Sequence, residues 1–166
     1  ATLRDLRAAN QNAGVGGLTF TPLTGGNTMA QLWHYCVRDQ PVTGHYTMAQ
    51  LPVIAQLWNW NTGQTGPLVP ISTTNADSFL CYNNDWSSVG GFTGCTNLDM
   101  LWLNDCGLNE SEVDTVLSQL VTAGHTNGNV DLTANAVPSS AGLTNVNTLR
   151  SRGWTVDVDV VVGGPG

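Results

Sequence analysis

The segment Leu98–Leu108, LDMLWLNDCGL, decides the fold of this chain. Its apolar residues follow the pattern L-x-x-L-x-L-x-x-C-x-L, filled by Leu98, Leu101, Leu103, Cys106 and Leu108. Leu101 and Leu103 are two residues apart, so both point to the same side of an extended strand, toward a core. Cys106 and Leu108 then return the chain to that side. One such strand cannot bury its apolar face alone, so the pattern predicts further copies stacked beside it.

Three other segments in the second half of the chain fit this pattern. Aligned on Leu101, they start at Phe79, Val130 and Val156, at spacings of 22, 29 and 26 residues. Their further inward positions are Cys81 and Asn84 in the first copy, Leu132 and Asn135 in the third, and Val158 in the fourth. The sequence therefore predicts four stacked strands between residues 76 and 160.

The segments between these strands have the features of helices. Asn109 with Glu112 forms a capping box, and an apolar stripe at helical spacing follows as far as Gly124. A second such segment runs from Pro138 to Gly153. Strand, helix and glycine in this order predict an α/β coil with a parallel sheet on its concave side, joined by right-handed crossovers.

On these motifs, residues Ala76 to Val160 resemble the leucine-rich-repeat family. The run NGNVDLTANAVPSSAGLTNVNTLRSRGWTV, from Asn127 to Val156, resembles a repeat variant of tailed-phage virion proteins and bacterial surface proteins. That variant has N-G-x-V/L-D-L, an Asn, P-S or P-T, and then R-G-W-T-V. The family implies a binding or scaffold role with no catalytic residues and no cofactor. With about four turns, the predicted arc is short.

Composition limits the classes of partner. The chain has five arginine and lysine residues against twelve acidic ones, for a net charge of -7. This argues against nucleic acid and against an anionic membrane surface as partners, since both attract basic proteins. Charged residues are only 10 % of the chain, against roughly 25 % in ordinary soluble domains. No apolar run reaches the length of about 18 residues that spans a membrane.

Residues 1–75 are expected to form a separate helical unit for anchoring or oligomerisation, followed by the repeat arc and tail over 76–166. Apolar spacing predicts helices over Thr2–Gln11, over Met29–Arg38 and after Pro52. The sequence favours a two-domain chain.

Three local patterns refine the expectation for residues 1–75. The glycine-bounded run GGLTFTPLTGG predicts a brief strand or arm. The pentapeptide TMAQL starts at both Thr28 and Thr47, which indicates a duplicated helical unit of about nineteen residues. The segment Asn61–Ser72, with two prolines and two glycines, is the expected domain boundary.

The predicted repeats also define a candidate binding surface. Residues that alternate with the core positions are expected to point outward on the concave face: Leu80, Tyr82, Trp102, Asn104, Asp131, Thr133, Asp157 and Asp159. Asp131 and Asp157 fall side by side, which indicates either a solvated acidic surface or a site for a partner's arginine or a cation. Trp102 is either an exposed interface anchor or packed beneath the N-terminal unit.

Trp58 and Trp60 also leave two interpretations open. Both rings fit half-buried packing at the junction of the two units, and both fit stacking on a glycan.

The cysteines and histidines form no catalytic or metal motif. Buried reduced thiols are expected for the four cysteines, with a Cys95–Cys106 disulfide as the alternative outside a cell. The H-x-C of His34 and Cys36, even with His45 nearby, lacks the second ligand pair of a zinc site. No metal and no catalytic residue is therefore predicted.

The resemblance, together with the composition, implies a non-enzymatic structural protein of a tailed-phage virion, as a capsid or tail decoration, accessory or fibre-like component. Its expected partners are other virion proteins and further copies of itself, in a particle assembled in the host cytoplasm. The alternative is a secreted bacterial surface module, extracellular or at the cell surface, that binds a glycan or a host protein.

Overall fold

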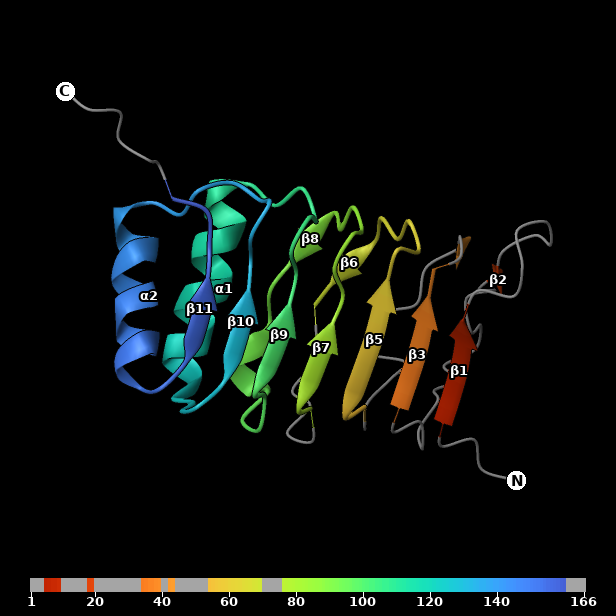
Figure 1. The fold of residues 1–166 in the computed structure, drawn as a ribbon, viewed down its shortest axis with the longest axis horizontal. Coiled ribbons are helices and arrows are strands. Elements are labelled where there is room, and N and C mark those ends of the chain that lie inside the picture. The colour runs from red at the N-terminus through yellow and green to blue at the C-terminus, as the bar shows by residue number, and fades with distance from the viewer. Residues whose placement is uncertain are drawn as a thin grey trace.

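The chain forms an α/β structure built on one parallel sheet (Figure 1). The computed structural model describes residues 34–39, 54–69 and 76–160, together with the backbone of residues 5–9, 18–19 and 42–43. No helix in these described ranges is long and apolar enough to cross a membrane.

The main sheet has seven strands whose order across the sheet is their order along the chain. They are β1 (Asp5–Ala9), β3 (His34–Arg38), β5 (Gln56–Trp60), β7 (Ser78–Leu80), β9 (Met100–Trp102), β10 (Asn129–Asp131) and β11 (Thr155–Asp157). Every neighbouring pair is parallel. The chain therefore returns behind the sheet after each strand and advances by one strand per turn.

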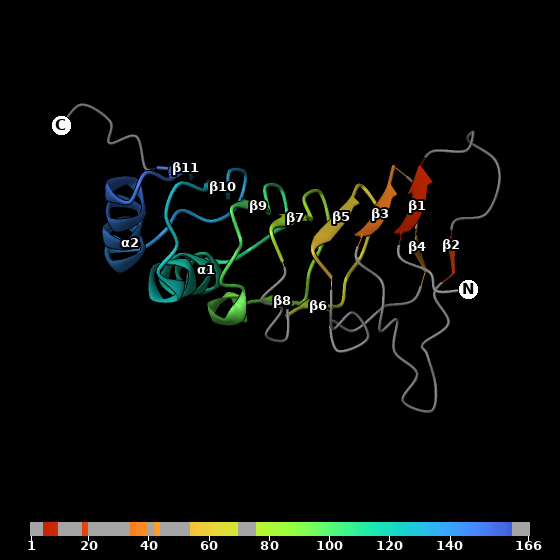
Figure 2. The same ribbon diagram turned by 90° about the horizontal axis from the view of Figure 1, so that it is seen from below.

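The segments behind the sheet change along the chain (Figure 2). In the first half they are short strands that also pair in parallel: β2 (Leu18–Thr19) with β4 (Val42–Thr43), and β6 (Pro67–Leu68) with β8 (Ser88–Val89). In the second half they are the 3-10 helix η2 (Phe92–Gly94) and the helices α1 (Glu110–Ala123) and α2 (Ser140–Ser151).

Both predicted helices are confirmed, with their predicted ends. Asn109 and Glu112 form the capping box of α1, and Gly124 ends that helix with a left-handed φ of 79°. Ser139 caps α2 by accepting hydrogen bonds from the backbone N–H groups of Ala141 and Gly142.

The predicted alignment of the strands is confirmed by the sheet register. Phe79, Leu101, Val130 and Val156 are successive cross-strand partners, and each is at most 2 % exposed. The other predicted core positions lie beside them: Cys81, Leu98, Leu103, Cys106, Leu108 and Leu132 are buried, and Val158 packs against the core while partly exposed.

In three successive turns, a buried or half-buried side chain binds the backbone where the chain leaves a strand. Asn84 donates to the carbonyl oxygen of Asn59 at 2.7 Å and accepts from the N–H groups of Thr62 and Gln64. Two turns later, Asn135 donates to the Leu103 carbonyl at 2.9 Å.

Cys106 has the equivalent position in the turn between those two asparagines. Its N–H donates to Oδ1 of Asn135 at 3.1 Å, and its thiol lies 3.3 Å from the Cys81 carbonyl oxygen. These contacts satisfy interior backbone groups that would otherwise be buried without partners.

A second repeated feature lies just outside each strand. Asp39, Asn61, Asn83 and Asp105, spaced by 22 residues, all adopt left-handed backbone with φ between 51° and 54°. Asparagine and aspartate tolerate this conformation better than other non-glycine residues. Their side chains also connect neighbouring turns, since Asn61 donates to Asp39 at 2.7 Å and Asn83 donates to Asn61 at 2.6 Å.

The predicted helical character of residues 1–75 is wrong wherever the structure describes them. β1 lies within the helix predicted over Thr2–Gln11, β3 lies within Met29–Arg38, and β5 follows Pro52. Short apolar runs fit helical and strand periods equally well. Along β5 the side chains alternate between buried and half-exposed, which is the period of a strand.

The sheet also continues across the predicted boundary at Asn61–Ser72. β5 and β7 flank this segment and pair directly, and β6 lies inside it. The brief strand predicted in GGLTFTPLTGG is present as β2. The two TMAQL copies lie outside the described residues, whereas β3 and β5 pair His34 with Gln56 at a spacing of 22.

The four cysteines are free and buried, so the disulfide alternative for Cys95 and Cys106 is wrong. Burial raises the pKa of Cys106 to about 12 and raises the pKa of Cys81 well above its ordinary value. Both thiols therefore stay neutral at physiological pH.

We expect Asn84→Ala to destabilise the fold by about 3 kcal/mol, because it leaves several buried backbone groups without partners. Urea unfolding followed by circular dichroism measures this loss. The matched control is Asn147→Ala on the exposed surface of α2, which we expect to change stability by less than about 0.5 kcal/mol. Equal effects of the two substitutions would contradict the role given to Asn84.

We expect the native protein to react with a thiol reagent only slowly at about pH 8, because its cysteines are buried and Cys81 and Cys106 are protonated. After unfolding in guanidinium, all four should react rapidly. Time-resolved absorbance of the released chromophore gives both rates, and fast labelling of the folded protein would contradict this burial.

Candidate binding face

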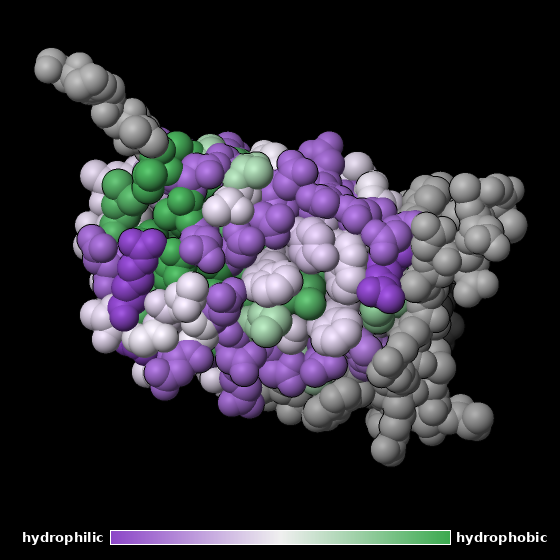
Figure 3. Space-filling view, viewed as in Figure 1, coloured by the Kyte–Doolittle hydropathy of each residue, from purple (hydrophilic) through white to green (hydrophobic). Residues whose placement is uncertain are grey.

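The side of the main sheet that faces away from the helices carries the candidate site (Figures 1 and 3). We call it the open face and define it by its outward side chains: Arg38, Trp58, Trp60, Tyr82, Trp102, Asn104, Asp131, Thr133, Asp157 and Asp159. In Figure 3 the middle of this face consists of residues of intermediate hydropathy, with hydrophilic residues above and below it and hydrophobic residues on the side of the C-terminal strands.

The sheet register arranges these side chains in rows across the strands. One row passes from Trp58 through Leu80, Trp102 and Asp131 to Asp157, as successive cross-strand partners. The predicted adjacency of Asp131 and Asp157 is therefore confirmed. Leu80 was also expected on the surface, but it is only 9 % exposed because tryptophans stand on both neighbouring strands.

Four aromatic side chains form a continuous strip, which we call the aromatic strip: Trp58, Trp60, Tyr82 and Trp102. Trp60 and Tyr82 are stacked, with ring centroids 5.3 Å apart and planes 11° from parallel. Trp58 lies 6.4 Å from Trp60, and Trp102 lies 6.2 Å from Tyr82. All four rings are partly exposed.

The central ring of this strip is covered on both faces. The guanidinium carbon of Arg38, on β3, lies over Trp60 at 5.5 Å from its centroid, a cation–π contact. Tyr82 stacks on Trp60 from the opposite neighbour, β7. Trp60 therefore presents its edge to solvent, and not a ring face.

Hydrogen bonds within the sheet hold two of the other rings. The indole N–H of Trp58 donates to the Ser78 hydroxyl at 3.1 Å, and the indole N–H of Trp102 donates to Oδ1 of Asn129 at 2.6 Å. With these polar groups engaged, both rings offer mainly carbon surface to a partner. Their positions are also fixed before any partner arrives.

The open face has an acidic end beyond the strip. Asp131 is held by its own turn, since its Oδ1 accepts from the N–H and the hydroxyl of Thr133 at 3.0 and 2.7 Å. Asp157 is exposed and Asp159 is half-exposed. From β3 to β11 the open face thus changes from Arg38, with Asp39 beside it, through the aromatic rings to the acidic residues.

Tyr82 stays a neutral hydroxyl in this setting. Burial raises its pKa above the ordinary value, the negative charge of Asp39 raises it further, and Arg38 partly opposes the shift. Its ring therefore contributes aromatic surface without charge.

Sequence reasoning found one half of this face and missed the other. The seven outward positions predicted from Tyr82 to Asp159 all lie on it. The sequence instead predicts a helix at Arg38, and it leaves Trp58 and Trp60 either at a domain junction or stacked on a glycan. The 22-residue spacing of Asp39, Asn61, Asn83 and Asp105 is the signal that could have extended the repeats to β3.

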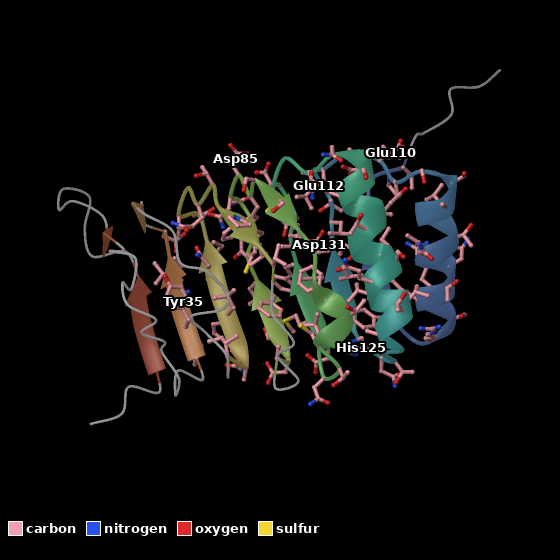
Figure 4. All side chains as sticks on the ribbon, turned by 180° about the vertical axis from the view of Figure 1, so that it is seen from behind. Tyr35, Asp85, Glu110, Glu112, His125 and Asp131 are labelled. Atoms are coloured by element: carbon pink, nitrogen blue, oxygen red, sulfur yellow. The ribbon has the colours of Figure 1, made fainter. Side chains whose placement is uncertain are left out.

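The described histidines lie apart from one another. His34 packs edge-on against Trp58 at 4.9 Å, while His125 packs against Trp154 at 6.1 Å, beyond the end of α1 opposite Glu110 and Glu112 (Figure 4). Burial lowers the pKa of His125. Within the described residues, no group of three His, Cys, Asp or Glu side chains could hold a metal ion.

Comparison of the chain with protein-family models, with curated proteins and with solved structures finds no match. The function is therefore argued from the geometry of the open face and from the sequence motifs.

We expect Tyr82→Ala to remove a near-ultraviolet circular dichroism signal that arises from the stacked Trp60–Tyr82 pair, and to cost about 1 kcal/mol of stability. Tyr82→Phe keeps a stacking ring and should retain most of both. Unchanged near-ultraviolet spectra for Tyr82→Ala would contradict the stacked strip in solution.

Proposed function

We propose that this chain is a non-enzymatic structural protein of leucine-rich-repeat type that binds other proteins through its open face within a tailed-phage virion. The observation that carries this proposal is the pre-assembled aromatic strip, flanked by charges of opposite sign, on a rigid parallel sheet.

Three features support the repeat type. The chain advances by one parallel strand per turn, a buried Asn or Cys occupies the same place in successive turns, and the later turns return through helices. These are the elements that the pattern around Leu98–Leu108 predicts.

The side chains of the open face support protein binding. Trp, Tyr and Arg are the residues most enriched at the energetic centres of protein interfaces. Here ring stacking, two indole hydrogen bonds and the Arg38 contact already fix them, so binding costs less conformational entropy.

The same geometry favours a protein over a glycan. A sugar ring stacks flat on an exposed aromatic face, and in Trp60 both faces are already covered, by Arg38 and by Tyr82. The edges of the strip instead suit the side chains of a polypeptide.

The virion setting rests on the run from Asn127 to Val156, whose fixed residues pack as one unit. A Cβ atom at Gly128 would overlap the indole of Trp154, so that tryptophan requires glycine there. A Cβ at Gly153, where φ is 87°, would collide with the Asn127 side chain. The motif that resembles phage virion proteins is thus a single structural module.

We expect the double variant Trp60→Ser/Trp102→Ser to be lost from particles that contain the wild-type chain, because it removes two anchors of the open face. Mass spectrometry of virions purified from the strain that carries the gene measures incorporation. Circular dichroism first establishes that the variant is folded.

The matched control is Leu143→Ser, an exposed apolar residue on α2 that is 37 % accessible and lies on the helix side. It should be incorporated as well as wild type. Absence of the wild-type chain from particles, or normal incorporation of the double variant, would contradict the proposal.

A further inference from the structure

We propose that the open face binds a second copy of this chain, related to the first by a two-fold axis that runs parallel to the strands over β7. This inference rests on the proposed function, because it takes the open face as a protein-binding surface and names its occupant.

The order of charged and aromatic residues across the sheet is the first support for this dimer. Arg38 is on β3, second in the order, and Asp131 is on β10, second from the other end. Trp58 on β5 and Trp102 on β9 are likewise equidistant from the central strand β7. A two-fold axis over β7 therefore places a cation over acids at both ends and aromatic rings over aromatic rings in the middle.

Such a surface is complementary to itself, which is what an isologous dimer requires. Because the axis is parallel to the strands, each row of side chains meets the same row of the other copy. Arg38 then faces the position of Thr133, with Asp131 on the same strand and Asp159 on the next. Its long side chain can reach either carboxylate.

Charge on this face favours a second copy at close range. Arg150 and Arg152 donate to the backbone carbonyls of Val156 and Val121, at 2.6 Å each. Both side chains therefore make hydrogen bonds within their own chain. Arg38 is exposed at one end of the open face, and the acidic residues stand at the other. The overall repulsion between two chains of charge -7 is screened beyond about 8 Å at physiological salt.

The area of the open face permits a modest dimer. The strands of the main sheet are three to five residues long, and their outward positions extend over roughly five residues each. With seven strands about 4.8 Å apart, this gives a face of about 30 by 15 Å, or near 900 Å² for both copies together. This is below the roughly 1,000 Å² that a stable specific interface buries, so the expected dimer is a weak one. Figure 2 shows the sheet shallowly curved, with the strands that carry the rings between those that carry the charges.

Charge exchange between two variants tests the arrangement directly. In a dimer of Arg38→Glu, the new glutamate of each copy lies near the acidic end of the other copy. In a dimer of Asp157→Arg/Asp159→Arg, Arg38 of each copy lies near the new arginines of the other. We expect each variant alone to be monomeric, with the dimer dissociation constant raised about 100-fold or more. In an equimolar mixture opposite charges meet at both ends, so the heterodimer should form again.

Sedimentation velocity of the purified full chain and of the mixture, at up to about 100 μM, measures these states. Ser118→Glu, which adds an acid on the exposed side of α1, is the control and should dimerise like wild type. Folding of every variant is checked by circular dichroism.

Restored heterodimer in the mixture supports the proposal, since no interface elsewhere on the chain predicts it. A monomeric wild type, dimers that survive both charge variants, or a mixture that stays monomeric would each overturn it. If the wild type is monomeric while Trp60→Ser/Trp102→Ser is still lost from particles, the open face binds a different virion protein, and the proposed function stands without this inference.

Discussion

Each strand of the sheet ends by turning its backbone into the protein interior, and there its polar groups must find partners. Asn84 and Asn135 each bind backbone groups of their own turn and of the preceding turn. In the turn between them, the thiol of Cys106 lies against the Cys81 carbonyl oxygen. Since these bonds connect one turn to the next, they fix the register of the parallel strands. The rows of outward side chains on the open face follow from that register.

From β3 to β11, the length of each turn matches what lies behind the sheet. Where successive strands are 22 residues apart, as from β3 to β9, the described parts of the return segments contain two-residue strands and, before β9, a single 3-10 turn. The longer turns from β9 to β10 and from β10 to β11 contain α1 and α2, of 14 and 12 residues. One sheet is therefore combined with two kinds of outer layer.

This difference explains what the sequence could predict. The two helices of the second half have caps, apolar stripes and closing glycines, so their ends and the strands between them were read correctly. The described residues of the first half contain no helix, and the apolar runs around Tyr35 and Leu57 are too short to distinguish a helix from a strand. At the position of Leu103, the turn of β5 has Asn59, a polar residue that is nonetheless fully buried, so the apolar pattern does not reveal it.

Because the sequence does not predict β3 and β5, it does not predict the half of the open face that these two strands carry. Outward positions follow from the strand register, and without β3 and β5 the residues Arg38, Trp58 and Trp60 had no defined direction. Their contacts are with residues about 22 positions away, which helix and strand periods within one segment cannot reveal.

Because each turn of this fold adds one strand to the sheet, the order of residues along the chain becomes their order across the open face. The basic residue of the open face comes from its first half, and the acidic residues come from its last two strands, so the face acquires a direction that follows the chain itself. In a globular fold with shuffled strands, the same residues would be scattered. Here Arg38 and Asp157, far apart in sequence, stand near opposite ends of one continuous surface with aromatic rings between them. The order of charged residues along the sequence therefore becomes their order across the open face. That order is sufficient to specify a two-fold contact between two copies of the chain.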